Sequence, residues 1–280
     1  MPVADYPLTS PRRAPCLDSV MTEFGILFFA AIVFGLALGS FCGSAAYRMA
    51  HGWSLFTPSG SHCPGCGKRL GVGENIPLVS FFLQRGKCRS CDSNLSILYP
   101  IAESAAGCWS GLMFLQFGMT VPYWVFMGIG VILLLISLVD LEAYFIPDVL
   151  VVVGAVLAGG ASFMGIGAPP TEAFLAAAFG ALLLQGVRLG YQALRGREGM
   201  GFGDVKLMFL LGLCTGLAGL PFVLMLSALF AFVCTALARR RAVDGSTQLP
   251  FGPYLCAGCA AYMLFGDELQ RLAVSLGGGA

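Results

Sequence analysis

Residues 125–140 read VFMGIGVILLLISLVD, a run that is apolar or small apart from Ser137 until it ends on Asp140. A membrane-spanning helix needs about 20 mostly apolar residues, and this run reaches that length when it is extended back to residue 121. An ionisable group beside such a run is costly to keep near a bilayer, so it is a candidate functional residue. The stretch therefore predicts a transmembrane helix over residues 121–139 that ends at a functional acid.

The whole chain is, like this run, rich in hydrophobic residues and poor in charged ones. Hydrophobic residues make up 57% of its 280 residues, and charged residues make up only 11%, whereas soluble domains have roughly 25% charged residues. So few charges cannot cover the surface of a soluble enzyme, and the net charge of +1 excludes a nucleic-acid binder that works by bulk charge. The composition indicates a multi-pass membrane protein whose surface contacts lipid.

Seven further apolar runs predict an all-α polytopic fold with about eight transmembrane helices. We expect these runs at residues 24–46, 97–117, 147–164, 171–191, 205–217, 220–238 and 252–265. The runs at 205–217 and 252–265 are short, which is why the count is approximate. We expect four parts: an outer N-terminal segment (1–23), a first transmembrane helix (24–50), a small polar module (51–96) and a membrane-embedded helical domain (97–280).

The basic residues predict the orientation. In the eight-helix arrangement, 13 of the 16 Lys and Arg residues fall on one side, namely Arg48, Lys68, Arg69, Arg85, Lys87, Arg89, Arg188, Arg195, Arg197, Lys206, Arg239, Arg240 and Arg241. Positively charged loops remain in the cytosol, so we assign this side to the cytosol and both chain ends to the outside. The first apolar run is too long for a cleavable signal peptide and predicts an anchored helix.

Four of the 11 cysteines form two Cys-x-x-Cys pairs in the polar module, Cys63 with Cys66 and Cys88 with Cys91. This spacing lets two short turns present four thiolates to one tetrahedral zinc ion. Two disulfides or free thiols are the alternative, and a cytosolic location argues against disulfides because that compartment keeps thiols reduced. We expect a structural zinc ion that folds a module too small for a core of its own.

A second acid, Asp204, matches Asp140 in depth. It lies in the sequence Gly201-Phe202-Gly203-Asp204-Val205-Lys206, at the start of a predicted span and on the same side as Asp140. Two carboxylates that meet across a bundle share one proton, which is the chemistry of aspartic proteases. We expect Gly201 and Gly203 to give a substrate close access to the backbone. Lys206 either supports the pair or extends toward lipid headgroups.

The chain resembles the bacterial type IV prepilin peptidases, bifunctional leader peptidases and N-methyltransferases that are aspartic proteases of the GxGD type. The resemblance runs from about residue 39 to about residue 258 and depends on several blocks in order: Gly39-Ser40-Phe41, the cysteine tetrad, Glu74-Asn75-Ile76-Pro77-Leu78, Tyr99-Pro100 with Glu103, Asp140-Leu141, Ile146-Pro147-Asp148, Gly201 to Leu207, and Pro250-Phe251-Gly252-Pro253. Each block alone is modest evidence, but their order is specific.

The resemblance implies that Asp140 and Asp204 are the catalytic aspartates of an enzyme in the bacterial inner membrane. It implies cleavage of the short basic leader of type IV prepilins or type II secretion pseudopilins on the cytosolic face. It also implies N-methylation of the new N-terminus with S-adenosylmethionine as the donor. Glu74 and Asn75 are our candidates for binding that donor, and they follow from the resemblance alone.

One block departs from the family pattern. The family has Asn-Val where this chain has Gly43-Ser44, and Gly35, Gly39 and Gly43 then form a stripe of small residues on one helix face. If the asparagine serves methylation, a leader peptidase without methyltransferase activity is the alternative. A zinc-stapled transporter or scaffold is a third reading, but the acids lie at span ends and the sequence has no convincing internal repeat.

Overall fold

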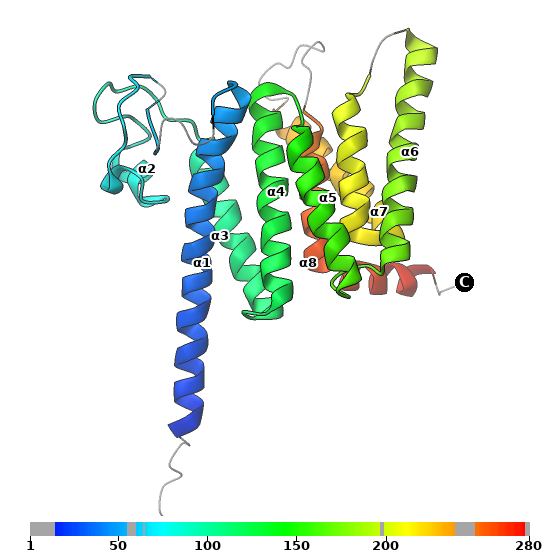
Figure 1. Ribbon diagram of the computed structural model, residues 1–280, viewed down its shortest axis with the longest axis horizontal. Coiled ribbons are helices and arrows are strands. Elements are labelled where there is room, and N and C mark those ends of the chain that lie inside the picture. The colour runs from blue at the N-terminus through cyan, green and yellow to red at the C-terminus, as the bar shows by residue number, and fades with distance from the viewer. Residues whose placement is uncertain (1–14, 55–59, 64, 197–198, 239–249, 278–280) are drawn as a thin grey trace, which may run out of the picture.

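The computed structural model describes residues 15–54, 60–63, 65–196, 199–238 and 250–277, and this part of the chain is helical (Figure 1). Its elements are α1 (Pro15–Ala50), the short η1 (Val72–Glu74), α2 (Val79–Leu83), α3 (Leu98–Phe117), α4 (Val121–Ala143), α5 (Asp148–Phe163), α6 (Pro170–Arg195), α7 (Phe202–Ala238) and α8 (Gly252–Gly277). The described residues form no strand, only two isolated β-bridges in the cysteine module. The predicted all-α fold is confirmed.

The two shortest predicted spans correspond to breaks in long helices. In α7, Gly216 has φ 67° and ψ −179°, so two helices meet there and the chain reverses direction (Figure 1). We expected this break slightly later, between the apolar runs at 205–217 and 220–238. In α8, the non-helical Phe265 ends the apolar part, and the rest of the helix lies across the lower end of the bundle (Figure 1).

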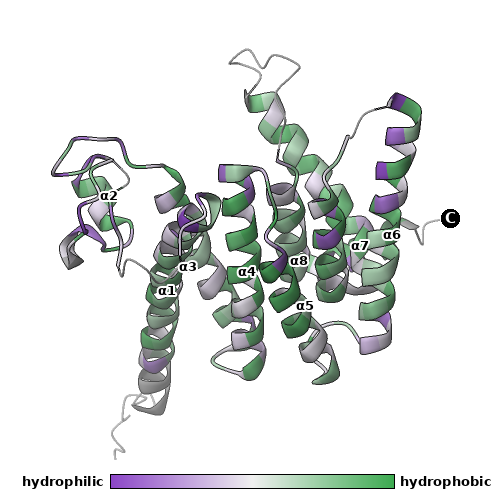
Figure 2. Cartoon of the chain, turned by 45° about the horizontal axis from the view of Figure 1, so that its top comes forward, coloured by the Kyte–Doolittle hydropathy of each residue, from purple (hydrophilic) through white to green (hydrophobic). Residues whose placement is uncertain are grey.

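Four of the described helices are long and apolar enough to cross a membrane, at Met21–Ala50, Val121–Ala143, Pro170–Arg195 and Phe202–Leu237, and α5 is apolar but shorter. The Phe202–Leu237 segment contains the break at Gly216, so it consists of two shorter helices. Hydrophobic residues dominate the bundle, whereas the cysteine module is markedly hydrophilic (Figure 2). The protein is therefore a membrane protein with one polar appendage.

One end of the bundle gathers the polar features. The cysteine module, the end of α4 and the starts of α5 and α7 lie at the upper end in Figure 1, opposite the start of α1 and the end of α8. This is the side to which we assigned the positive loops. Four of the arginines used in that assignment, Arg197 and Arg239 to Arg241, lie outside the described residues.

The glycine stripe of α1 packs directly on α3. A Cβ at Gly35 would lie 2.4 Å from the carbonyl oxygen of Ala106, and a Cβ at Gly39 would lie 2.6 Å from that of Ala102. At Gly43 it would lie 2.8 Å from the Tyr99 ring. The predicted small-residue contact is confirmed, and it holds the base of the cysteine module against the bundle.

Helix α4 lies at the centre and brings Asp140 to the upper end. It packs against α1, α3, α5 and α8, and its last turns are buried, including Ile136 and Val139. Pro147 caps the start of α5 at Asp148, so the connection from α4 is short. This central position explains why an acid at the end of α4 is surrounded by other helices.

Candidate functional site

Asp140 is buried at the end of α4 and is held by the start of α8. The backbone amide of Gly252 donates a hydrogen bond of 3.1 Å to Asp140 Oδ2. Only glycine fits at this position, because a Cβ on Gly252 would lie 2.6 Å from the same oxygen. The Pro250-Phe251-Gly252-Pro253 block of the sequence is therefore part of the site, as a support for Asp140.

Asp204 lies in the first turn of α7, close enough to Asp140 for their charges to interact. Ile146, from the α4–α5 connection, lies beside both Gly203 of α7 and Gly252 of α8. A Cβ on Gly203 would lie 3.2 Å from Ile146 Cβ, and a Cβ on Gly252 would lie 3.4 Å from Ile146 Cδ1. Both acids thus lie at the upper end of the bundle, in the last turn of α4 and the first turn of α7.

Gly201 and Gly203 flank Asp204 without unusual backbone angles, since neither has a positive φ. Gly201 lies beside the carboxylate, with its Cβ position 3.7 Å from Asp204 Oδ2. At Gly203 the close approach of Ile146 favours glycine, because a Cβ there would be crowded. At Gly201 a Cβ would make only ordinary contacts, and neither its surroundings nor its backbone angle explains the glycine.

Lys206 pairs with a third acid, Asp148. Its Nζ lies 2.6 Å from Asp148 Oδ1, and both side chains are partly exposed. Nζ also lies 5.0 Å from the centre of the Phe202 ring. Lys206 therefore ties the start of α7 to the start of α5, and the partner of Asp148 is this lysine.

The two Cys-x-x-Cys pairs form matching turns. The amides of Cys63 and Cys88 donate to the carbonyls of Lys68 and Ser93, both at 2.9 Å. The residue after each second cysteine has a positive φ, 68° at Gly67 and 53° at Asp92. Asp tolerates this conformation better than most side chains. The same turn therefore occurs at both Cys-x-x-Cys pairs, as their equal spacing predicted.

The four thiols converge on one point. The sulfur atoms of Cys63, Cys66, Cys88 and Cys91 all lie within 4.8 Å of one another. A tetrahedral zinc ion with Zn–S bonds of about 2.3 Å requires sulfur atoms about 3.8 Å apart. The hydrogen bond with the Ser93 hydroxyl lowers the pKa of the Cys91 thiol, which favours the thiolate that a metal needs. The cluster fits a structural metal ion.

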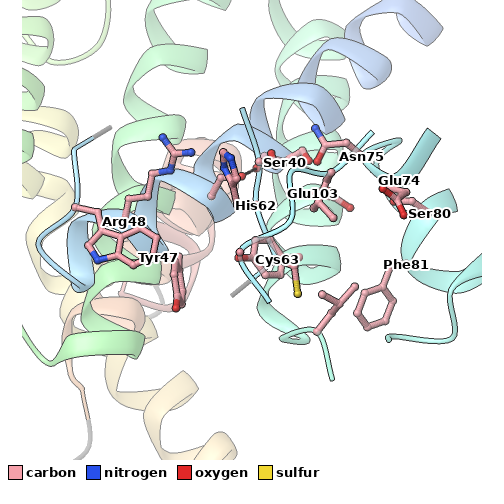
Figure 3. A pocket seen from close by; sticks show the side chains of 17 residues that line it. Ser40, Tyr47, Arg48, His62, Cys63, Glu74, Asn75, Ser80, Phe81 and Glu103 are labelled. Carbon is pink, nitrogen blue, oxygen red and sulfur yellow. Dashed lines mark hydrogen bonds between the residues drawn. The ribbon is translucent and has the colours of Figure 1, made fainter. Parts of the chain in front are cut away.

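A cavity of about 410 Å³ lies between the upper end of α1, the cysteine module and the start of α3 (Figure 3). Glu74 and Asn75, our candidates for binding the methyl donor, both line it. Aromatic rings of Tyr47, Trp53 and Tyr99 also line it. The hydrogen bond from the Gly71 amide, with the nearby charges of Lys68 and Arg89, holds the pKa of Glu74 below its usual range.

Glu103 supports one wall of this cavity. It is buried on α3, and its Oε2 accepts a hydrogen bond of 2.7 Å from the amide of Leu78. Leu78 has φ 59° and ψ −51°, a strained conformation for a side chain of this size. Glu103 therefore holds a strained turn of the segment that contains Glu74 and Asn75.

The sequence did not predict two features of the site, the contact between Gly252 and Asp140 and the cavity beside Glu74. The support of Asp140 by Gly252 joins residues that are 112 positions apart. The cavity is built by three segments, and no local pattern indicates that they meet. Ser44, at the position where the chain departs from the family pattern, also lines the cavity, and its hydroxyl donates to the carbonyl of Ser40 at 3.1 Å.

Comparison with known proteins agrees with this arrangement. The family model described as the bacterial peptidase A24 N-terminal domain matches residues 33–117, which include the four cysteines. The model of the type IV leader peptidase family matches residues 127–236, which include Asp140 and Asp204. No solved structure matches.

Curated relatives cover nearly the whole chain. A prepilin leader peptidase/N-methyltransferase of Pseudomonas aeruginosa is 32% identical over 94% of this chain and 99% of its own length. Proteins of the same name from Pseudomonas putida and Aeromonas hydrophila are 32% and 34% identical over 88% and 78% of this chain, and over 93% and 76% of their own lengths. With two acids at one end of a helical bundle and a four-cysteine module beside them, the chain belongs to the type IV leader peptidase family.

Proposed function

We propose that the protein is an aspartic endopeptidase that removes the leader of prepilins or pseudopilins. The proposal is supported by the placement of Asp140 and Asp204 at the same end of the bundle, near enough for their charges to interact, with the Gly252 amide donating to Asp140. Relatives that cover almost the whole chain are named for the same activity. The positive loops support placing this end in the cytosol and the protein in the inner membrane.

In this mechanism the ionised member of the pair takes a proton from a water molecule. The water oxygen then attacks the carbonyl carbon of the scissile peptide, while the protonated member donates its hydrogen to the carbonyl oxygen. When the tetrahedral intermediate collapses, the C–N bond breaks and the leaving amine gains a proton from the pair. The two acids titrate together, so the pH profile belongs to the pair and not to either residue.

The experiment is a cleavage assay on a reconstituted prepilin with wild type, Asp140→Asn and Asp204→Asn. We expect each amide to reduce the cleavage rate by about a thousandfold or more, as removal of a catalytic group does. Glu142→Gln is the matched control, because Glu142 is an exposed acid only two residues beyond Asp140. Normal cleavage by either aspartate variant would exclude the dyad.

We also propose that residues 51–96 form a zinc module, with the ion bound by Cys63, Cys66, Cys88 and Cys91. When bound, zinc supplies folding energy to a module with little core of its own and leaves no open position for chemistry. The chain's own contribution is the repeated turn, the Ser93 hydroxyl and the nearby basic residues. The module forms a wall of the cavity that contains Glu74 and Asn75.

The second proposed activity is N-methylation of the new amino terminus, with S-adenosylmethionine bound in the 410 Å³ cavity. Its volume suits a ligand of this size. The cavity offers aromatic faces for a purine or a cation, and carboxylates for the positive charges of the donor. The donor, when bound, supplies a methyl group that forms a C–N bond with the amine as its C–S bond breaks and the amine loses a proton.

Methylation can be tested separately from cleavage. We expect Glu74→Ala and Asn75→Ala to weaken binding of labelled S-adenosylmethionine and transfer to the product, while the rate of leader cleavage stays close to that of wild type. Glu142→Gln again serves as the control. If wild type cleaves the substrate without transferring a methyl group, the protein is a leader peptidase alone, which is the alternative that Gly43-Ser44 raises.

A further inference from the structure

An apolar groove begins next to Asp140 and runs along the membrane-embedded surface. It has a volume of about 290 Å³. Its lining includes Leu141, which directly follows Asp140, and Pro253, which directly follows Gly252. Since the Gly252 amide binds Asp140, the upper end of the groove lies beside the candidate active site.

The groove is elongated along the helices. Helix α4 packs against both α3 and α8, so it forms the floor and the other two form the walls. On each helix the lining residues lie on one face: Ile101, Ala105 and Trp109 on α3; Met127, Val131, Leu134, Leu138 and Leu141 on α4; Pro253, Ala257 and Ala260 on α8. From Met127 to Leu141 the helix rises about 21 Å, at 1.5 Å per residue.

The lower floor is held in place by Trp109. Its indole Nε1 donates a hydrogen bond of 3.0 Å to the carbonyl of Phe126. A Cβ on Gly130 would lie 2.1 Å from that nitrogen, so the ring occupies the space that glycine leaves. Trp109 thereby fixes the spacing of α3 and α4, which makes the groove a built feature of the fold.

The surface of the groove is apolar, and small side chains on its walls leave space for a second helix. The hydroxyl of Ser137 is turned into its own helix, where it donates to the carbonyl of Leu133 at 2.8 Å. The walls carry small residues that are exposed, Ala105 on α3 and Ala257 on α8. Small residues let a second helix approach closely within a membrane, whereas this surface offers no partner for a charged segment.

We propose that the groove receives an apolar transmembrane helix of the substrate, the segment that continues from the cleaved bond into the bilayer. This inference rests on the proposed peptidase function. A chain that leaves the aspartates toward the hydrocarbon layer must satisfy its own backbone hydrogen bonds, and a single segment can do so only as a helix. The groove supplies that helix with an apolar surface whose upper end lies beside Asp140. The polar leader remains at the upper end.

Site-specific crosslinking tests the occupant. A benzophenone amino acid replaces Ala105 or Ala257 in an Asp140→Asn background, which keeps the substrate whole, and a full-length prepilin of Pseudomonas aeruginosa is reconstituted with the protein in liposomes. The matched control carries the same group at Val152, an apolar α5 residue that is 60% exposed. We expect crosslinks to the prepilin from both groove positions, suppressed by excess unlabelled prepilin, and none from Val152.

Three results would overturn the proposal: crosslinks from the groove to lipid only, crosslinks to a second copy of the protein only, or equal prepilin crosslinking from Val152. Cleavage by the wild type with the same prepilin is measured in parallel. Cleavage without groove crosslinks would reject the groove and leave the peptidase intact. Absence of wild-type cleavage would reject the peptidase function itself.

A filling variant gives a second, kinetic readout. Ala257→Trp places a large side chain in the groove, and we expect the KM for full-length prepilin to rise about tenfold. Val156→Trp, on a side chain of α5 that is 71% exposed, should leave KM within about twofold, as surface substitutions usually do. Equal KM values for the two variants would contradict the groove as the binding site.

Discussion

The amide of Gly252 donates to Asp140 Oδ2 at 3.1 Å, across 112 positions of sequence. The start of α8 thereby positions an acid at the end of α4. Because a Cβ on Gly252 would lie 2.6 Å from that oxygen, this contact requires glycine. The arrangement of the candidate dyad thus depends on a third helix as well as on the two that contain the acids.

Gly252→Ala should damage activity more than stability. The added methyl group displaces the Asp140 carboxylate, and a shift of about 1 Å in a catalytic group can reduce the rate by about a hundredfold. We expect kcat for leader cleavage to fall by about tenfold to a hundredfold. Gly160→Ala is the control, because a Cβ on Gly160 meets nothing within 4 Å. If both alanines cleave at the wild-type rate, Gly252 does not position Asp140.

Gly39→Ala should loosen α1 from α3. Its Cβ would lie 2.6 Å from the Ala102 carbonyl oxygen and from Glu103 Cα, both backbone atoms. Overpacking of this kind costs about 1–3 kcal/mol. The free energy of unfolding in detergent measures the loss, and Gly25→Ala, whose Cβ meets nothing within 4 Å, should have no comparable effect. A stable Gly39→Ala variant would show that the helices can separate at little cost.

Removal of zinc should unfold the cysteine module and spare the bundle. Elemental analysis should find about one zinc ion per chain in the wild type, as a filled four-thiolate site requires, and none in Cys63→Ala/Cys66→Ala. Limited proteolysis should then cut within residues 61–96. Cys256→Ala/Cys259→Ala is the control with the same spacing and should retain the ion. A tetrad variant that still binds zinc would rule out this ligand set.

The ion pair between Lys206 and Asp148 should contribute little to stability. Its nitrogen and oxygen lie 2.6 Å apart, but the side chains are 34% and 67% exposed. Pairs of this kind are worth about 1 kcal/mol or less. A double-mutant cycle with Lys206→Met and Asp148→Asn measures the coupling in thermal unfolding. If Lys206→Met alone changes the pH profile of cleavage and Asp148→Asn does not, Lys206 acts on the dyad directly.

The fold was largely predictable from the sequence because apolar runs report directly on helices that cross a bilayer. The run that ends at Asp140 is helix α4, and the short runs at 205–217 and 252–265 correspond to parts of α7 and α8. The cysteine spacing predicted a cluster because two residues between thiols suffice for a turn that presents both.

The contacts between helices were not predictable in the same way. Periodicity shows which face of one helix is apolar, but not which faces meet. The pairing of Lys206 with Asp148, and of Glu103 with the amide of Leu78, depends on how elements far apart in the sequence are placed. The cavity beside Glu74 and the groove beside Asp140 follow from such placement, so no local pattern indicates them.

The break at Gly216 has a consequence for the surrounding lipid. The part of α7 that starts beside Asp204 has only 14 residues, Phe202 to Thr215, before the break, and such a helix is about 21 Å long. The hydrocarbon core of a bilayer is about 30 Å thick, and short spans are accommodated by local thinning. A span this short predicts that the bilayer is thinner next to the aspartates. Local thinning would let water and the scissile bond reach the carboxylates without a channel through the protein.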